Sequence, residues 1–127
     1  MSMTDYGENW LLQYVVSSGT KYLGLYLTPP GEATNGTEAS GGGYARQPIT
    51  FGSPANGQVV STQLIQFPVC TAAWGTVTGF AVCNAATGGN PLWYGQLTDA
   101  AGVPTPKNVT PGDIFQVPVG DLVLTLD

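Results

Sequence analysis

The spacing of the apolar residues changes once along the chain, from a helical period to a period of two. Between residues 4 and 16 the apolar side chains recur every three or four positions, which predicts one amphipathic helix. Thr4 is suited to cap its first turn, and Asp5 and Glu8 stand where the helix dipole favours acidic side chains. The Ser-Ser-Gly run that follows ends the helix. The apolar members of the pattern are Tyr6, Trp10, Leu11, Tyr14 and Val15.

After the helix, apolar and polar residues alternate, which is typical of β-strands. In residues 21–28 the three leucines share one face and the two tyrosines share the other. Residues 74–84 are interpreted as one long strand, followed by a hairpin turn at 87–91. Residues 114–117 are expected to pair with 122–126 across a tight turn. The remaining strands are predicted at residues 44–51, 59–69 (one or two strands) and 92–97.

The fold class follows from this order of elements. About eight strands at short spacing after one helix predict an all-β fold, an antiparallel β-sandwich or jelly roll with one N-terminal α-helix. Residues 1–127 suffice for one hydrophobic core, so we expect a single domain. Within it, residues 21–127 form the sandwich and residues 29–43 a long polar loop. Pro48 places the 44–51 strand at a sheet edge or a bulge.

Charge is scarce in this chain. Charged residues make up 9% of it, against a usual figure of roughly 25%. The net charge is −5, and three scattered basic residues are too few to bind a nucleic-acid backbone. No apolar run is long enough for a membrane span, and the acidic N-terminus lacks the layout of a signal peptide. We therefore expect no nucleic-acid or membrane partner, and a cytoplasmic origin in which Cys70 and Cys83 stay reduced as small core residues.

One segment is unusual even against this background. Residues 47–98 contain no Asp, Glu, Lys or Arg at all. Soluble monomers normally scatter charge over their surface and protect sheet edges with it. Two explanations stay open: a surface made polar by uncharged side chains, or a segment that faces protein neighbours in an assembly, since the cores of interfaces are depleted in charge.

The residues offer little for catalysis. The chain has no histidine, the commonest general base and metal ligand. Two cysteines are too few for a zinc site, the acidic residues form no calcium-loop pattern, and nothing singles out a carboxylate pair of the glycosidase kind. Residues 41–43, three glycines, lead into a strand instead of a helix, so they predict a glycine-only backbone conformation and no phosphate loop. We predict no catalytic, cofactor-binding or metal-binding residue and no cofactor.

Arg46 and Glu38 flank the glycine run. An arginine on a strand among apolar residues usually needs a carboxylate partner. Our hypothesis is that Arg46 pairs with Glu38 or another loop acid and anchors the long loop to the sheet as a structural device. The alternative is a solvated surface arginine.

Aromatic residues give the candidate contact surfaces. At helical or two-residue spacing they belong more often to a core than to a sugar-stacking platform. Trp93 and Tyr94, however, are adjacent on a strand, so they point to opposite faces and at least one leaves the core. The residues that we expect to contact a partner are Trp10, Tyr14, Trp93, Glu32 and Asn35.

Several stretches together carry a family resemblance. They are YGENWLLQYVV, LGLYLTPPGEA, GTEASGGGYARQPITFG, FPVCTAAWGTVTGFAVCNAATGGNPLWYGQLT and GDIFQVPVGDLVLTL. The chain resembles a family of small tailed-bacteriophage virion structural proteins that are often named phage tail fibre protein. Some members are capsid decoration or cement proteins. Cys83, where members tend to have a larger hydrophobic residue, and Gly79, where a polar ring is frequent, depart from the family pattern.

The resemblance implies a jelly-roll β-sandwich without catalytic activity, located in the virion after synthesis in the host bacterial cytoplasm. The function expected first is that of a capsid decoration (cement) protein, a homodimer or homotrimer that stabilises the head by binding neighbouring major capsid protein subunits. The alternative is a tail or tail-fibre component that binds host-surface glycan.

Overall fold

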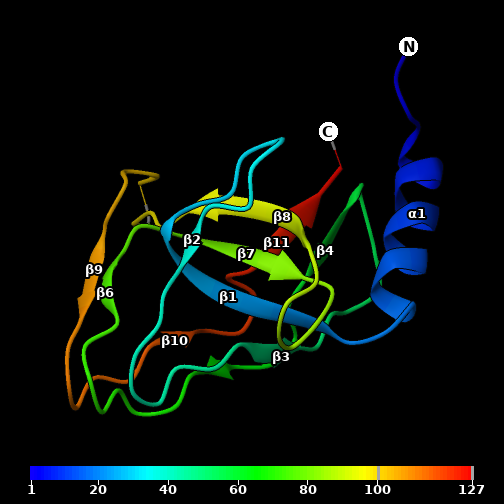
Figure 1. The fold of residues 1–127 in the computed structure, drawn as a ribbon. Coiled ribbons are helices and arrows are strands. Elements are labelled where there is room, and N and C mark those ends of the chain that lie inside the picture. Colours follow the sequence, from blue (N-terminus) through cyan, green and yellow to red (C-terminus); the bar gives the residue numbers. More distant parts are fainter. Residues whose placement is uncertain (100, 127) are drawn as a thin grey trace.

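Helix α1 (Asp5–Ser17) precedes a body of short antiparallel strands and lies along one side of it (Figure 1). The structure is a computed structural model in which residues 1–99 and 101–126 are described. The Thr4 hydroxyl caps the helix by accepting a hydrogen bond from the Gly7 N–H at 3.1 Å. The predicted helix is therefore confirmed, one residue later at each end than expected.

The largest sheet is built around one central strand. Strand β1 binds β7 along one edge, while its other edge is shared by β3, near Tyr22, and β2, near Tyr26. β8 continues the sheet beyond β7 through the predicted hairpin, and all pairs are antiparallel. Pro48 lies in an edge strand as expected, because among the described strands β3 pairs with β1 alone. The five strands are β1 (Lys21–Thr28), β2 (Thr37–Glu38), β3 (Gln47–Ile49), β7 (Gly79–Cys83) and β8 (Pro91–Gln96).

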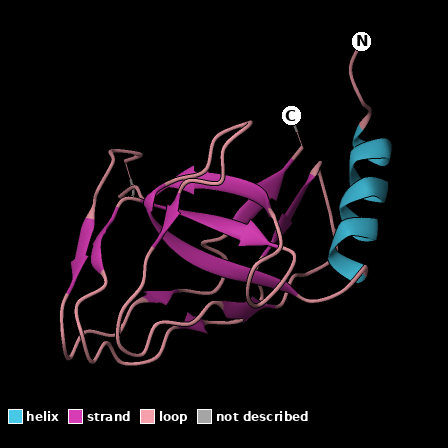
Figure 2. Cartoon of the chain, viewed as in Figure 1, coloured by secondary structure: helices cyan, strands magenta, loops and turns pink. Residues whose placement is uncertain are grey.

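Three two-stranded antiparallel sheets pack against this one. Figure 2 shows that they are short strands joined by long loops. Buried side chains from every one of them join the same core as Leu23, Leu25 and Val82 of the large sheet. The chain is thus mostly β with antiparallel sheets and one N-terminal helix, and the predicted fold class is confirmed. The pairs are β4 (Gln58–Val60) with β11 (Val123–Thr125), β5 (Ile65–Gln66) with β10 (Gln116–Val117), and β6 (Gly75–Val77) with β9 (Lys107–Val109).

The centre of the core is aromatic. The Trp74 ring packs edge-on against Tyr44 and Phe67, with ring centroids 5.2 and 6.3 Å apart. Its Nε1–H donates to the Gly42 carbonyl at 2.8 Å, so the buried indole has its hydrogen bond. Cys70 belongs to this core, whereas Cys83 lies in a small separate cluster with Tyr26, and both thiols are free and buried.

The prediction of one long strand over residues 74–84 is wrong. The chain breaks at Thr78, whose hydroxyl donates to the Leu27 carbonyl at 2.8 Å. The half before it pairs with β9 and the half after it with β1 and β8. The expected single face therefore does not exist: Trp74 is buried while Thr76, two residues further on, is exposed.

The predicted pairing of residues 114–117 with 122–126 is also wrong. β10 pairs with β5 and β11 with β4, so partners come from distant parts of the sequence. The chain does turn at residues 119–121, but the turn binds Ser61 instead of joining two paired strands. The Ser61 N–H donates to the Leu122 carbonyl, and the Ser61 carbonyl accepts from the Gly120 N–H. β9 lies in a stretch for which no strand was predicted, and the strand expected over 44–51 is only Gln47–Ile49.

The glycine run confirms the prediction of a backbone that other residues cannot adopt. Gly41 and Gly43 have φ values of +151° and +83°. The run also lies against the chain before Trp74, since the Thr71 N–H donates to the Gly42 carbonyl at 3.0 Å. A Cβ on Gly43 would lie 2.4 Å from the Val69 carbonyl oxygen. Close packing, as well as φ, therefore requires glycine here.

We expect Gly43→Ala to destabilise the protein more than Gly102→Ala. The two glycines share nearly the same φ, +83° and +82°, but a Cβ on Gly102 meets nothing within 4 Å. Gly102→Ala therefore reports the cost of the backbone conformation alone, about 1–2 kcal/mol. Gly43→Ala adds the clash and should lose at least about 2 kcal/mol more in urea unfolding. Equal losses in the two variants would show that the close packing contributes nothing.

Candidate functional site: an aromatic helix face beside a closed ion pair

Arg46 is held on all sides by hydrogen bonds. Its Nε and Nη2 atoms each donate to a Glu38 carboxylate oxygen at 2.8 Å, a bidentate ion pair. Its Nη1 donates to the backbone carbonyls of Ala85 and Gly88 at 2.9 and 2.8 Å. The Arg46 side chain is only 10% exposed. It therefore joins β2, the start of β3 and the β7–β8 hairpin, and it is not a solvated surface arginine.

Apart from Arg46, the groups that contact Glu38 are uncharged. The Tyr44 hydroxyl donates to its Oε2 at 2.5 Å and accepts from the Leu25 N–H at 3.0 Å. Burial, together with the hydrogen bond to Glu38, raises the pKa of Tyr44 above its ordinary value. Burial likewise raises the pKa of Tyr26 and of the Cys83 thiol. Because all three groups keep their protons at neutral pH, none of them is a general base or a reactive nucleophile there.

The Arg46–Glu38 cluster thus connects the loop before β3 to the large sheet through several hydrogen bonds. Gly24 is part of it, since a Cβ at this position would lie 2.9 Å from Glu38 Oε2. The pairing of Arg46 with Glu38 is present, and its contribution to stability stays a prediction. The carbonyl partners at Ala85 and Gly88 were missed, because backbone acceptors leave no signature in a sequence.

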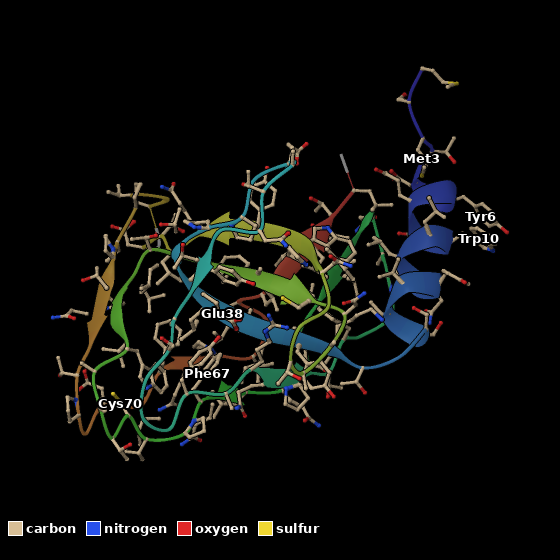
Figure 3. All side chains as sticks on the ribbon, viewed as in Figure 1. Met3, Tyr6, Trp10, Glu38, Phe67 and Cys70 are labelled. Carbon is tan, nitrogen blue, oxygen red and sulfur yellow. The ribbon has the colours of Figure 1, made fainter. Side chains whose placement is uncertain are left out.

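Helix α1 turns its aromatic side away from the body. Tyr6, Trp10 and Tyr14 stand four residues apart and share one face, and they are 81%, 62% and 66% exposed. Figure 3 shows Tyr6 and Trp10 projecting from the side of the helix opposite the strands. We call these three residues the aromatic face of α1. Met3, just before the helix, is also exposed.

The side of α1 that packs on the body has fewer large apolar side chains than the aromatic face. Leu12 is its one buried residue within the described chain, and Val16 packs against the core beside it. Asn9 Oδ1 accepts a hydrogen bond from the Gly57 N–H at 3.0 Å. The helix is therefore fixed in place without using its aromatic face.

The aromatic face of α1 is a large exposed apolar surface, and the contact role expected for Trp10 and Tyr14 stays a prediction. Each aromatic side chain buries about 150–250 Å² when it is covered. Three of them together offer about 450–750 Å² when fully covered, comparable to the roughly 300–600 Å² of the largest, often functional, apolar patch on a typical monomer. The patch carries no acid, base or metal ligand, so what it offers is apolar contact.

The other predicted contact residues lie on a different part of the surface. Trp93 is half-buried against the core, and its Nε1–H donates to the Thr125 carbonyl at 2.9 Å. Its neighbour Tyr94 is the member of the pair that faces solvent, with its hydroxyl 3.0 Å from Glu32 Oε2. Glu32 and Asn35 are exposed on the loop between β1 and β2. The contact roles of all these residues stay predictions.

The described residues contain neither a metal-binding cluster nor a membrane helix. No group of three or more His, Cys, Asp or Glu side chains in residues 1–99 and 101–126 is placed to hold a metal ion. None of the helices in the described part of the chain has the length and apolar character to cross a membrane.

The mostly β body, with an exposed aromatic helix face and a closed ion pair between Arg46 and Glu38, has the features of a structural protein. Comparison with protein-family models makes this specific: residues 2–125 match the family described as podophage GP4 fiber I protein gp80. Because the match spans nearly the whole chain, the chain belongs to this family. It is a non-enzymatic structural component of the phage virion. A search of the curated proteins finds no match.

The family confirms the resemblance to phage virion structural proteins and the absence of enzymatic activity. It supports the tail-fibre alternative better than the capsid cement function expected first, for which it gives no support. A fibre protein has other virion proteins as partners.

Proposed function

We propose that this protein is a structural subunit of a podophage tail fibre and that it joins its virion neighbours by burying the aromatic face of α1. The observation that carries the proposal is the orientation of the helix. Three large aromatic side chains face water, while Leu12 is the residue of α1 that is buried against the body. Exposed apolar surface of this kind is unfavourable in a free monomer and is typical of a surface that a partner covers.

The composition of the body supports the same mechanism. Residues 47–98 carry no charged side chain, so the strands β3 to β8 present only uncharged groups to their neighbours. Such a surface approaches another protein without the cost of desolvating charges. Binding by burial also needs no cofactor, metal or proton transfer.

The test is incorporation into virions. A phage lacking the gene is complemented with wild type, with Trp10→Ala/Tyr14→Ala, or with Gln13→Ala, and copies per particle are counted by quantitative mass spectrometry. Truncating two central aromatic contacts typically costs at least 2 kcal/mol, so we expect at least about a tenfold loss of incorporation. Gln13, exposed on the same helix but not aromatic, is the matched control and should incorporate normally.

Unchanged incorporation of the double variant would contradict the attachment through α1. Immunogold labelling of an epitope tag distinguishes the location: label at the tail supports the fibre function. Label spread over the head, with hundreds of copies per particle, would contradict it and return the cement function to consideration.

A second candidate function is host-surface glycan binding, which the Tyr94–Glu32 pair favours. An exposed aromatic ring hydrogen-bonded to a carboxylate offers both a stacking surface and an acceptor for sugar hydroxyls. The experiment is a glycan array probed with purified wild type and Tyr94→Ala. Binding that Tyr94→Ala abolishes supports this function, and a wild type that binds no glycan contradicts it.

A further inference from the structure

Two asparagines of this chain are each followed by a glycine, Asn35 by Gly36 and Asn56 by Gly57. Asparagine is a thermolabile residue, because its side-chain amide can react with the backbone nitrogen of the next residue. Glycine in that next position leaves the nitrogen unhindered, since it has no side chain. In a folded protein the reaction also requires that the amide and the nitrogen can approach each other. The two Asn–Gly pairs differ in this respect.

Asn56 and Gly57 form the tight turn that precedes β4. The Ala55 N–H donates to the Gln58 carbonyl at 2.9 Å and the Gln58 N–H donates back at 3.0 Å, so the pair occupies the centre of a two-residue hairpin turn. Both central residues have positive φ, +54° and +74°. The Gly57 N–H also donates to Asn9 Oδ1 of α1 at 3.0 Å. The nitrogen that would attack Asn56 is therefore held by a hydrogen bond within a fixed backbone.

Asn35 and Gly36 lie on the exposed loop between β1 and β2 (Figure 1). The turn of this loop is closed by the Gly31 N–H, which donates to the carbonyl and the hydroxyl of Thr34, each at 3.1 Å. Within the described residues, no hydrogen bond involves the Asn35 amide or the Gly36 N–H. The Asn35 side chain can therefore rotate toward the Gly36 nitrogen without breaking a hydrogen bond.

The loop requires glycine at position 36. Gly36 has a φ of +66°, and a Cβ at this position would overlap the Thr28 carbonyl oxygen. The backbone of the loop thus keeps, directly after Asn35, the residue type that least hinders the reaction.

We propose that Asn35 is a site of spontaneous deamidation, whereas the tight turn and the hydrogen bond to Asn9 protect Asn56. In the first step the Gly36 nitrogen attacks Asn35 Cγ, and the new C–N bond closes a succinimide ring. The attacking nitrogen transfers its proton to the side-chain amide, which leaves as ammonia. Water then opens either of the two ring carbonyls and gives aspartate or isoaspartate at position 35. Water is the one co-reactant, so the reaction requires no enzyme, metal or oxidant.

The reaction changes the charge of one part of the surface. Each converted chain gains a carboxylate at position 35, in a protein whose net charge is already −5. This carboxylate lies on the same loop as Glu32, whose Oε2 is 3.0 Å from the Tyr94 hydroxyl. Ageing therefore makes this loop more acidic, and the isoaspartate product also lengthens its backbone. The reaction at Asn35 does not depend on the proposed attachment through α1.

Incubation of the purified protein in mildly alkaline buffer tests the contrast between the two sites. Peptide mass spectrometry follows conversion at positions 35 and 56, and synthetic peptides covering residues 32–38 and 53–59 give the rate of each pair without the fold. We expect position 35 to convert within about threefold of its peptide rate, and position 56 at least about tenfold below its own, because the turn must open first. In urea, where the turn is lost, both positions should convert at their peptide rates.

The variant Asn9→Ala tests the protection of Asn56. It removes the acceptor of the Gly57 N–H, so conversion at position 56 should rise at least about threefold while conversion at position 35 stays the same. Gln13→Ala, at an exposed position of the same helix, is the matched control and should change neither rate. Circular dichroism verifies that each variant is folded.

Two results would overturn the inference. One is a position 35 that, in the folded protein, converts as slowly relative to its peptide as position 56 does. The other is a position 56 that converts at its peptide rate although the protein is folded. A folded Asn9→Ala protein in which position 56 converts no faster than in wild type would overturn the protective role of Asn9.

Discussion

Replacing Arg46 with methionine is expected to lower the free energy of unfolding by about 3–5 kcal/mol. The main cost is not the lost ion pair itself but the partly buried groups that the substitution leaves without a partner. Glu38 would keep a carboxylate whose side chain is only 26% exposed, facing Tyr44 but no cation. The carbonyls of Ala85 and Gly88 would also lose their donor. Urea unfolding followed by fluorescence measures the change.

Two controls distinguish the effect of the Arg46–Glu38 ion pair from a general effect of removing charge. Lys107→Met removes an exposed cation without partners in the described chain and should change stability by less than about 0.5 kcal/mol. The double variant Glu38→Gln/Arg46→Met should be less destabilised than the sum of the single variants, since no unpaired charge is left. An Arg46→Met protein as stable as wild type would remove the anchoring hypothesis.

The second large effect is a contrast between two tryptophans. Trp74→Ala should lose about 3–5 kcal/mol, because the indole is 2% exposed and packs edge-on against two aromatic rings. Trp10→Ala, at 62% exposure, should change stability by less than about 0.5 kcal/mol. The order is expected to reverse for assembly into virions: Trp10→Ala lowers the number of copies per particle, and Trp74→Ala affects that number only through unfolding.

Thermal and urea unfolding of the two variants side by side give the comparison. A large destabilisation of Trp10→Ala would mean that the aromatic face supports the fold, which would undermine the proposed attachment through α1. A small effect of Trp74→Ala would show that the core closes over the missing ring.

The sequence predicted correctly those elements that depend on residues close to one another along the chain. The cap at Thr4, the strand over residues 21–28 and the β7–β8 hairpin each depend on residues close in sequence, and each is confirmed. The break at Thr78 was missed because its cause is a hydrogen bond to Leu27, far away in the chain. The partners of β10 and β11 were missed for the same reason: a good turn signal indicates that the chain bends but not which strand it then joins.

The features of the candidate site likewise divide into those that the sequence predicted and those that it did not. The charge and spacing of Glu38 and Arg46 indicated a pair, because so few charges compete for either of them. The helical pattern indicated an apolar side of α1 but not that Leu12, on another side, would pack on the body. An apolar pocket beside the end of β8 is lined by residues from β1, β7, β8, β9, β10 and the loops next to them, so no short stretch of sequence contains its signature.

The two buried free thiols have a consequence for the life of the particle. A virion protein folds in the reducing interior of a cell and then persists in open, oxidising water. Cys70 and Cys83 lie in separate buried clusters, so they neither need a disulfide to hold the fold nor expose a sulfur to oxidants. The protein therefore keeps the same covalent structure before and after cell lysis. Infectivity that depends on this protein should not change with the redox state of the medium.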